Sequence, residues 1–131
     1  MEGFEAIHPA ESDWVTTRTL PEYGRRYFDL TSRLGLTESR ARLWRYPVGA
    51  VGVPHLELEQ EEVFVVLEGT LTLLLGDPAA RKSMPAGAVA AVSPGTPIHV
   101  RNESDGEVVF LVYGAPPAAD AAETLPPPRE G

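Results

Sequence analysis

Two short apolar runs, at residues 63–67 and 70–75, dominate the hydrophobic pattern of this sequence. Each run is long enough for a β-strand but too short for a buried helix, and the first is rich in β-branched and aromatic residues. Glu68 and Gly69 lie between the runs, and glycine accepts the positive φ that tight turns need. The pattern therefore predicts two strands that pair as a β-hairpin.

Further short runs, separated by glycine and proline, predict more strands on both sides of this pair. The expected strands cover residues 39–46, 88–92, 98–101 and 107–113. One helical turn is expected at residues 29–34, and Gly35 would close it. Many short strands with so little helix are typical of an antiparallel barrel or jelly roll, so the sequence predicts an all-β, single-domain protein.

The composition divides the chain into three parts. Residues 1–35 have the pattern of an N-terminal arm with short strands, and residues 36–114 contain the core of the barrel. Residues 115–131 form a Pro/Ala-rich C-terminal tail with few large apolar side chains. Such a segment cannot bury enough surface to offset the entropy lost on ordering, so we expect the tail to be mobile or extended.

A group of polar residues precedes the first apolar run. Its members are His55, Glu57, Glu59, Glu61 and Glu62. Side chains two positions apart on a strand point to the same face, so His55, Glu57 and Glu59 should project together. The sequence therefore predicts a polar site at the entrance to the paired strands, with Glu59 and Glu61 facing solvent.

Composition narrows the classes of partner. The chain has 131 residues, a formal net charge of −8 and no cysteine, so disulfides and thiolate metal ligands are excluded. This acidity disfavours nucleic acid and anionic membrane surfaces, and we expect neither as a partner. No apolar run approaches the roughly 20 residues of a membrane helix, and the first residues lack the pattern of a secretory signal. A cytoplasmic location is therefore expected.

Arginines alternate with aromatic residues or small apolar residues in segment 39–46. Its even positions, which should share one face of a strand, are Arg40, Arg42, Trp44 and Tyr46. Arginine beside aromatic rings can bind nucleic acid. The alternative is a strand on a dimer face or at the barrel rim, where arginine stems cover apolar surface. The acidic charge of the chain favours the second interpretation.

Two motifs in the sequence resemble those of the cupin superfamily. The first has the spacing G-x5-H-x-E-x4-E-x6-G and consists of Gly49, His55, Glu57, Glu62 and Gly69. The second has the spacing G-x5-S-x-G-x2-I-x3-N and consists of Gly87, Ser93, Gly95, Ile98 and Asn102. The resemblance implies a cupin-like antiparallel jelly-roll β-barrel, which agrees with the fold class that the strand pattern predicts.

The resemblance also implies a metal site. Metal-dependent cupins supply three histidines and a glutamate from these motif positions to one divalent ion. This chain keeps His55 and Glu62, whereas Glu57 and Ile98 stand where the family usually has histidine. The donors His55, Glu57 and Glu62 can hold a divalent transition metal ion, but the loss of imidazole predicts weak binding, with no ion held tightly. The alternative is that Glu57 and Glu62 are solvated carboxylates at the pocket rim.

His99 lies one residue beyond the family's usual histidine position, so its direction matters. Adjacent side chains on a strand point to opposite faces, and burial favours the apolar Ile98 and Val100 inside. A regular strand therefore places His99 on the outer face or at an interface, whereas a bulge after Pro97 would bring it inward. The ligand pocket predicted for the regular strand consists of His55, Glu57, Glu62, Ile98 and Val100.

These observations leave three functional hypotheses, because one fold hosts many activities. The first is a small-molecule-binding protein without catalytic activity, which the altered metal motif favours. The second is a metal-dependent enzyme, an oxygenase or isomerase acting on a small polar or sugar-like substrate. The third is a metal-free enzyme in which His55 acts as a general base. In each case we expect a small-molecule ligand and a homodimer.

Overall fold

A computed structural model describes residues 3–118 and 121–131 of the chain. Residues 1–2 of the expected N-terminal arm and residues 119–120 of the expected tail lie outside the described residues. The described part has one α-helix, α1 (Leu30–Leu34), and 3-10 turns at Glu11–Asp13 and Pro21–Tyr23. Its strands are β1 (Val15–Thr16), β2 (Arg26–Asp29), β3 (Arg40–Tyr46), β4 (His55–Glu57), β5 (Glu61–Glu68), β6 (Thr70–Leu75), β7 (Ala80–Pro85), β8 (Val89–Val92), β9 (Ile98–Arg101), β10 (Val108–Ala115) and β11 (Ala122–Thr124).

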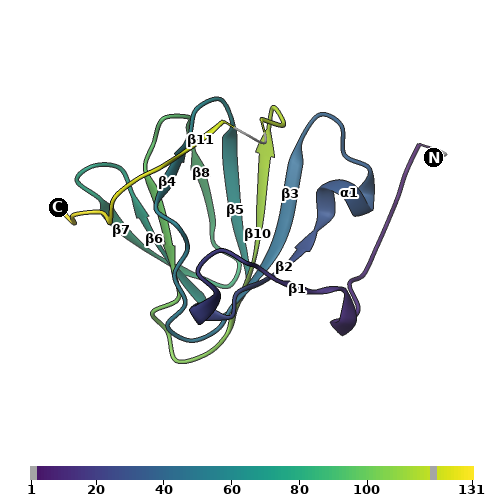
Figure 1. Ribbon diagram of the computed structural model, residues 1–131, viewed down its shortest axis with the longest axis horizontal. Coiled ribbons are helices and arrows are strands. Elements are labelled where there is room, and N and C mark those ends of the chain that lie inside the picture. The colour runs from purple at the N-terminus through teal and green to yellow at the C-terminus, as the bar shows by residue number, and fades with distance from the viewer. Residues whose placement is uncertain (1–2, 119–120) are drawn as a thin grey trace.

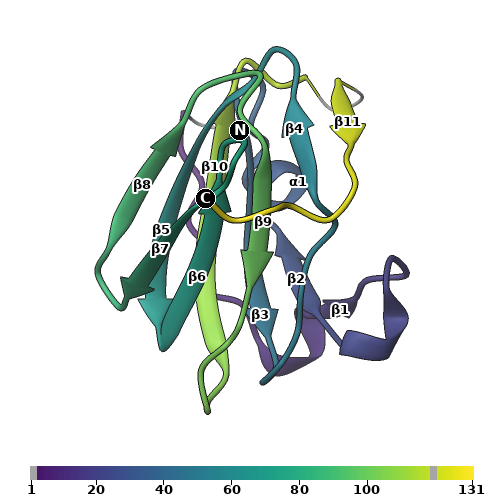
Figure 2. The same cartoon turned by 90° about the vertical axis from the view of Figure 1, so that its left-hand side faces the viewer.

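The described strands form two antiparallel sheets that face each other, as Figures 1 and 2 show. The first sheet has the order β1-β2-β3-β10-β5-β8, and the second has the order β11-β4-β9-β6-β7. The helix α1 follows β2 directly, with Asp29 accepting a hydrogen bond from the Thr31 amide and Gly35 closing its last turn. The all-β jelly-roll prediction is confirmed, and so is the single helical turn. Within the described residues, no helix is both long and apolar enough to cross a membrane.

The core lies between the two sheets and takes side chains from both. Period-2 alternation along β5 buries Phe64 and Val66, which meet Leu71 and Leu73 of β6 in one apolar cluster. Phe110 of β10 packs in the same cluster, with its ring 6.5 Å from that of Phe64. The first sheet is therefore fixed against the second by apolar side chains near the middle of the molecule.

The two apolar runs form strands, but the predicted β-hairpin between them is wrong. β5 pairs with β10 and β8, whereas β6 pairs with β7 and β9 in the other sheet. The chain changes sheets at Gly69, whose φ is +77° and where a Cβ would lie 2.6 Å from the Glu107 carbonyl oxygen. The two runs therefore face the common apolar core from opposite sheets.

Residues 121–131 of the C-terminal tail lie extended along the second sheet, so of the two expected states, mobile or extended, the structure has the extended one. β11 pairs with β4 at the edge of the second sheet, and the Leu125 amide donates to the Pro54 carbonyl. Further along, the Ala79 amide donates to the Arg129 carbonyl, and Glu130 forms a two-point ion pair with Arg81 at 2.8 and 2.9 Å. Backbone hydrogen bonds to an open strand edge hold this segment, and they require no large apolar side chains.

Candidate metal centre and ligand cavity

A cavity of about 420 Å³ opens between the sheets, bounded mainly by β3, β4, β5 and β10. Its volume lies within the usual range for small-molecule sites. The strand alternation that buries the core also directs polar side chains into this space. The lining residues include Thr17, Thr19, Arg25, Arg40, Arg42, Trp44, Tyr46, His55, Glu57, Gln60, Glu62, Phe64, Val100 and Phe110.

Three side chains in the cavity form a group that could hold a metal ion. His55 and Glu57 lie two positions apart on β4, so they share a face, and Glu62 reaches them from β5 of the opposite sheet. One potential ligand atom from each residue lies within 4.8 Å of the other two. The His55 Nε2 and Glu62 Oε1 atoms are 3.9 Å apart. The structure therefore brings together the three donors named from the sequence.

The orientation of His55 leaves one ring nitrogen available in the cavity. Its Nδ1 lies 2.9 Å from the carbonyl oxygen of Val53, which can only accept a hydrogen bond. In the neutral ring, Nδ1 is therefore the protonated nitrogen, and Nε2 presents its lone pair towards Glu62. Histidines that bind metal usually donate their second ring N–H in this way, because the bond fixes the tautomer and the ring orientation.

Both carboxylates are buried. Glu57 is 9% exposed and Glu62 is 7% exposed, so both lie inside the cavity and away from its rim. Within the described chain, neither Glu57 Oε2 nor Glu62 Oε1 has a hydrogen-bond partner. Burial, together with the nearby Glu57 and against the opposing effect of Arg40, raises the pKa of Glu62 to about 7. Such a pair favours binding a cation or a proton, since burying two like charges is unfavourable.

The donor set fits a divalent transition metal ion. One imidazole nitrogen and carboxylate oxygens from two glutamates suit first-row ions such as manganese, iron, nickel or zinc. The two buried oxygen atoms without partners would be satisfied by the ion. Glu59 and Glu61 are exposed, as the sequence predicted, and they take no part in this group. The strand β4 ends at Glu57, so Glu59 does not project into the cavity with His55 and Glu57, contrary to the expectation.

Ile98 and Val100 point inward from β9, but they have different surroundings. Val100 lines the cavity, whereas Ile98 is packed in the apolar core beside it. Ile98 is the cross-strand partner of His55, so the two residues are neighbours in the second sheet. Four of the five residues named for the pocket therefore line the cavity, and Ile98 lies in the core beside His55.

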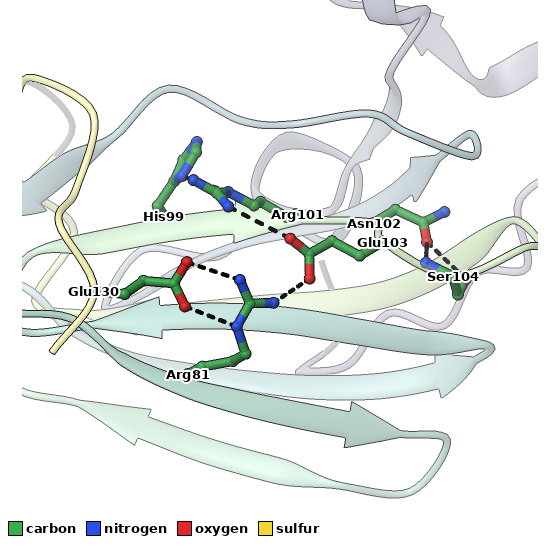
Figure 3. A network of polar contacts seen from close by, with 7 residues as sticks. All are labelled: Arg81, His99, Arg101, Asn102, Glu103, Ser104 and Glu130. Carbon is green, nitrogen blue, oxygen red and sulfur yellow. Dashed lines mark hydrogen bonds and ion pairs between the residues drawn. The ribbon is translucent and has the colours of Figure 1, made fainter.

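His99 points away from the metal-binding group, because β9 is regular and pairs with β6 without a bulge. It is 6% exposed, and its Nε2 lies 3.0 Å from the Gly52 carbonyl oxygen, while Arg101 Nε donates to its Nδ1 at 3.0 Å. Figure 3 shows His99 at one end of a polar network that continues through Arg101, Glu103 and Arg81 to Glu130 of the tail. Burial and the adjacent Arg101 lower the pKa of His99, so the ring is held neutral. The prediction of a regular strand with His99 on the outer face was correct, although other residues of the chain bury the ring there.

Several cavity residues were not identified from the sequence. The face of β3 that carries Arg40, Arg42, Trp44 and Tyr46 was assigned to a dimer face or barrel rim, but these side chains line the cavity. Gln60, 3% exposed, was also missed, although it lies between Glu57 and Glu62 in sequence. The alternation along β3 was a usable signal, because it placed two guanidinium groups and two aromatic rings on one face.

Comparison with known proteins agrees with this architecture. The family model described as "Cupin domain" matches residues 42–114, so the chain belongs to the cupin family. A search of curated proteins found no significant match.

Among solved structures, a sugar phosphate isomerase of the cupin superfamily from Silicibacter pomeroyi is 32% identical, with a TM-score of 0.65. The alignment covers 70% of this chain but only 59% of the isomerase. A cupin protein from Bacteroides fragilis has a TM-score of 0.70 at 18% identity and covers 91% and 89% of the two chains. KdgF from Halomonas has a TM-score of 0.67 at 17% identity and covers 82% and 91%. These last two show similarity of fold alone.

Proposed function

We propose that this cupin binds a small polar molecule in its cavity with the help of one divalent transition metal ion, held by His55, Glu57 and Glu62. The observation that carries this proposal is the pair of buried carboxylate oxygens without hydrogen-bond partners, close to a histidine whose tautomer presents Nε2. When bound, the ion would supply a Lewis acid that polarises an oxygen of the ligand. The surrounding side chains then bind and orient the rest of the molecule.

Isomerisation of a small sugar-like substrate is the reaction that the comparison favours, since the 32% identical relative is named as a sugar phosphate isomerase. The cavity itself offers polar groups on several sides, which suits a molecule with several oxygens. Phe64 and Phe110 form an apolar part of its wall, and they would limit the access of water. A ligand-binding protein without catalytic activity would use the same cavity, and assays of isomerase activity distinguish the two.

Metal titration tests the proposal directly. The full-length chain, stripped with a chelator and exchanged into clean buffer, should bind about one equivalent of manganese, nickel or zinc in isothermal titration calorimetry. Glu62→Gln should abolish this binding. Glu59→Gln makes the same chemical change at an exposed position in the same stretch and should leave it intact. Binding that is equal in the two variants would show that the ion lies elsewhere.

A homodimer stays a prediction, and the outer face of the first sheet is the surface we propose for it. This face carries apolar side chains side by side, since Val65 is the cross-strand partner of both Leu111 and Val89. Val89 is 62% exposed, and Leu67 and Tyr113 are also exposed. Light scattering coupled to size exclusion should report twice the chain mass for the wild type and a lower mass for Val89→Glu. The expected cytoplasmic location and the absence of nucleic-acid and membrane partners also stay predictions.

A further inference from the structure

Arg25, just before β2, is a buried cation in the wall of the cavity. The residue is 4% exposed and lines the same space as the metal-binding group. Its Nη1 donates to the Tyr46 hydroxyl at 3.1 Å, and its Nη2 donates to the Thr19 carbonyl oxygen at 2.8 Å. Its guanidinium carbon lies 5.4 Å from the ring centroids of both Trp44 and Tyr46. These contacts fix the orientation of the guanidinium group.

The charge of Arg25 is not matched by a carboxylate. Among the described residues, none places a carboxylate oxygen within 4.0 Å of its nitrogens, and Arg25 Nε has no hydrogen-bond partner. Aromatic faces and neutral dipoles offset only part of the cost of burying a full charge. Other arginines in this acidic chain do have carboxylate partners, namely Arg26, Arg33, Arg45, Arg81 and Arg101.

The wall next to Arg25 carries two more guanidinium groups. Arg40 and Arg42 of β3 line the cavity, and neither has a carboxylate within 4.0 Å in the described part of the chain. Arg42 is positioned by the Tyr27 ring, whose centroid lies 4.2 Å from its guanidinium carbon. The wall formed by the segments around β2 and β3 therefore carries three guanidinium groups and one carboxylate, that of Asp29, which accepts a hydrogen bond from the Thr31 amide.

We infer that Arg25 is an anion-binding residue, and that the ligand of this cavity carries a carboxylate or phosphate group. The planar guanidinium suits such oxyanions, because its N–H groups can donate to two oxygens at once. The ligand's charge would then supply the missing counterion. This inference rests on the proposed function only in that the ligand enters the same cavity. The ligand class is a small oxyanion with further oxygens that reach the metal-binding group.

Anion binding can be tested separately from metal binding. The full-length chain is titrated with inorganic phosphate and with acetate in chloride buffer of constant ionic strength, once metal-free and once with manganese. Melting temperature and calorimetry report binding. We expect phosphate, acetate or both to bind the metal-free wild type and to raise its melting temperature. Phosphate alone would indicate a phosphorylated ligand, and acetate alone would indicate a carboxylic acid.

Arg25→Met should weaken anion binding at least tenfold and leave the manganese stoichiometry unchanged. Arg25→Lys keeps the charge without the planar group, so it should retain part of the affinity, and it keeps the test decisive if the methionine variant does not fold. Arg18→Met removes an exposed arginine from the same segment and should have no effect. Equal anion affinity in wild type and both Arg25 variants, or no binding of either anion by the wild type, would overturn the inference. A wild-type protein that binds an anion through Arg25 but binds no manganese would overturn only the proposed function.

Discussion

Glu62→Gln should change the pH dependence of stability in a direction that the cavity geometry determines. Burial and the nearby Glu57 together raise the pKa of Glu62 from an ordinary value of 4.5 to about 7. The folded protein therefore binds this proton more tightly than the unfolded chain does. The resulting stabilisation is fully present below pH 4.5 and is lost as the pH rises through 7. The difference in pKa corresponds to a change of about 3 kcal/mol in the free energy of unfolding between low and high pH.

Most of this change, about 2.5 kcal/mol, should fall between pH 5 and pH 8. Glutamine has nearly the same shape as protonated glutamate but does not titrate. In chelated protein, Glu62→Gln should therefore gain stability relative to wild type across this range, by roughly 10 °C in melting temperature. Thermal unfolding followed by circular dichroism at several pH values measures the difference.

Glu59→Gln is the matched control, because Glu59 is exposed and its replacement should leave the pH profile of the wild type unchanged. Added manganese should reverse the order at pH 8, since only the wild type keeps the full donor set and is stabilised by the ion. Parallel curves for wild type and Glu62→Gln from pH 5 to pH 8 would refute the reasoning, since they would show that Glu62 is hydrated in solution.

Two further predictions follow from the sheets around the cavity. Truncation after Ala118 should lower the melting temperature by several degrees, as measured by circular dichroism. It removes β11 from the edge of β4 and Glu130 from its ion pair with Arg81. An unchanged melting temperature would instead support a mobile tail. Ile98→His should place an imidazole beside His55, its cross-strand neighbour, so nickel affinity measured by calorimetry should rise. The stability of the fold should fall, because a polar ring replaces a buried apolar side chain. His99→Ala, on the opposite face of β9, is the control and should leave nickel affinity unchanged.

The sequence predicted individual strands well because period-2 burial is a local signal. It gave the wrong partner for β6, since an apolar run shows which residues are buried but not which strand lies beside them. The position of the C-terminal tail could not be predicted from hydrophobicity either. Its order comes from backbone groups that meet the open edge of β4 and from Glu130, which meets Arg81. Neither contact leaves a trace in the hydrophobicity of residues 115–131.

The site was predictable where its residues lie close together in the chain. His55 and Glu57 share a face of β4 because they are two positions apart, and the motif resemblance added Glu62 from the next strand. Arg25 could not be found in this way, because its significance depends on what surrounds it. An arginine becomes informative only when the structure shows that it is buried, lines a cavity and has no carboxylate beside it.

The replacement of a family histidine by Glu57 bears on how an anionic ligand would be held. A divalent ion bound by His55, Glu57 and Glu62 forms a centre with no net charge, whereas three histidines and one glutamate leave one positive charge. A neutral centre attracts an oxyanion less, so more of the attraction must come from Arg25 and its neighbours. Glu57→His should therefore reduce the effect of Arg25→Met on phosphate affinity in manganese-loaded protein. A double-mutant cycle measures this coupling, which we expect to be about 1 kcal/mol. Strictly additive effects of the two substitutions would show that the metal centre and Arg25 do not act on the same ligand.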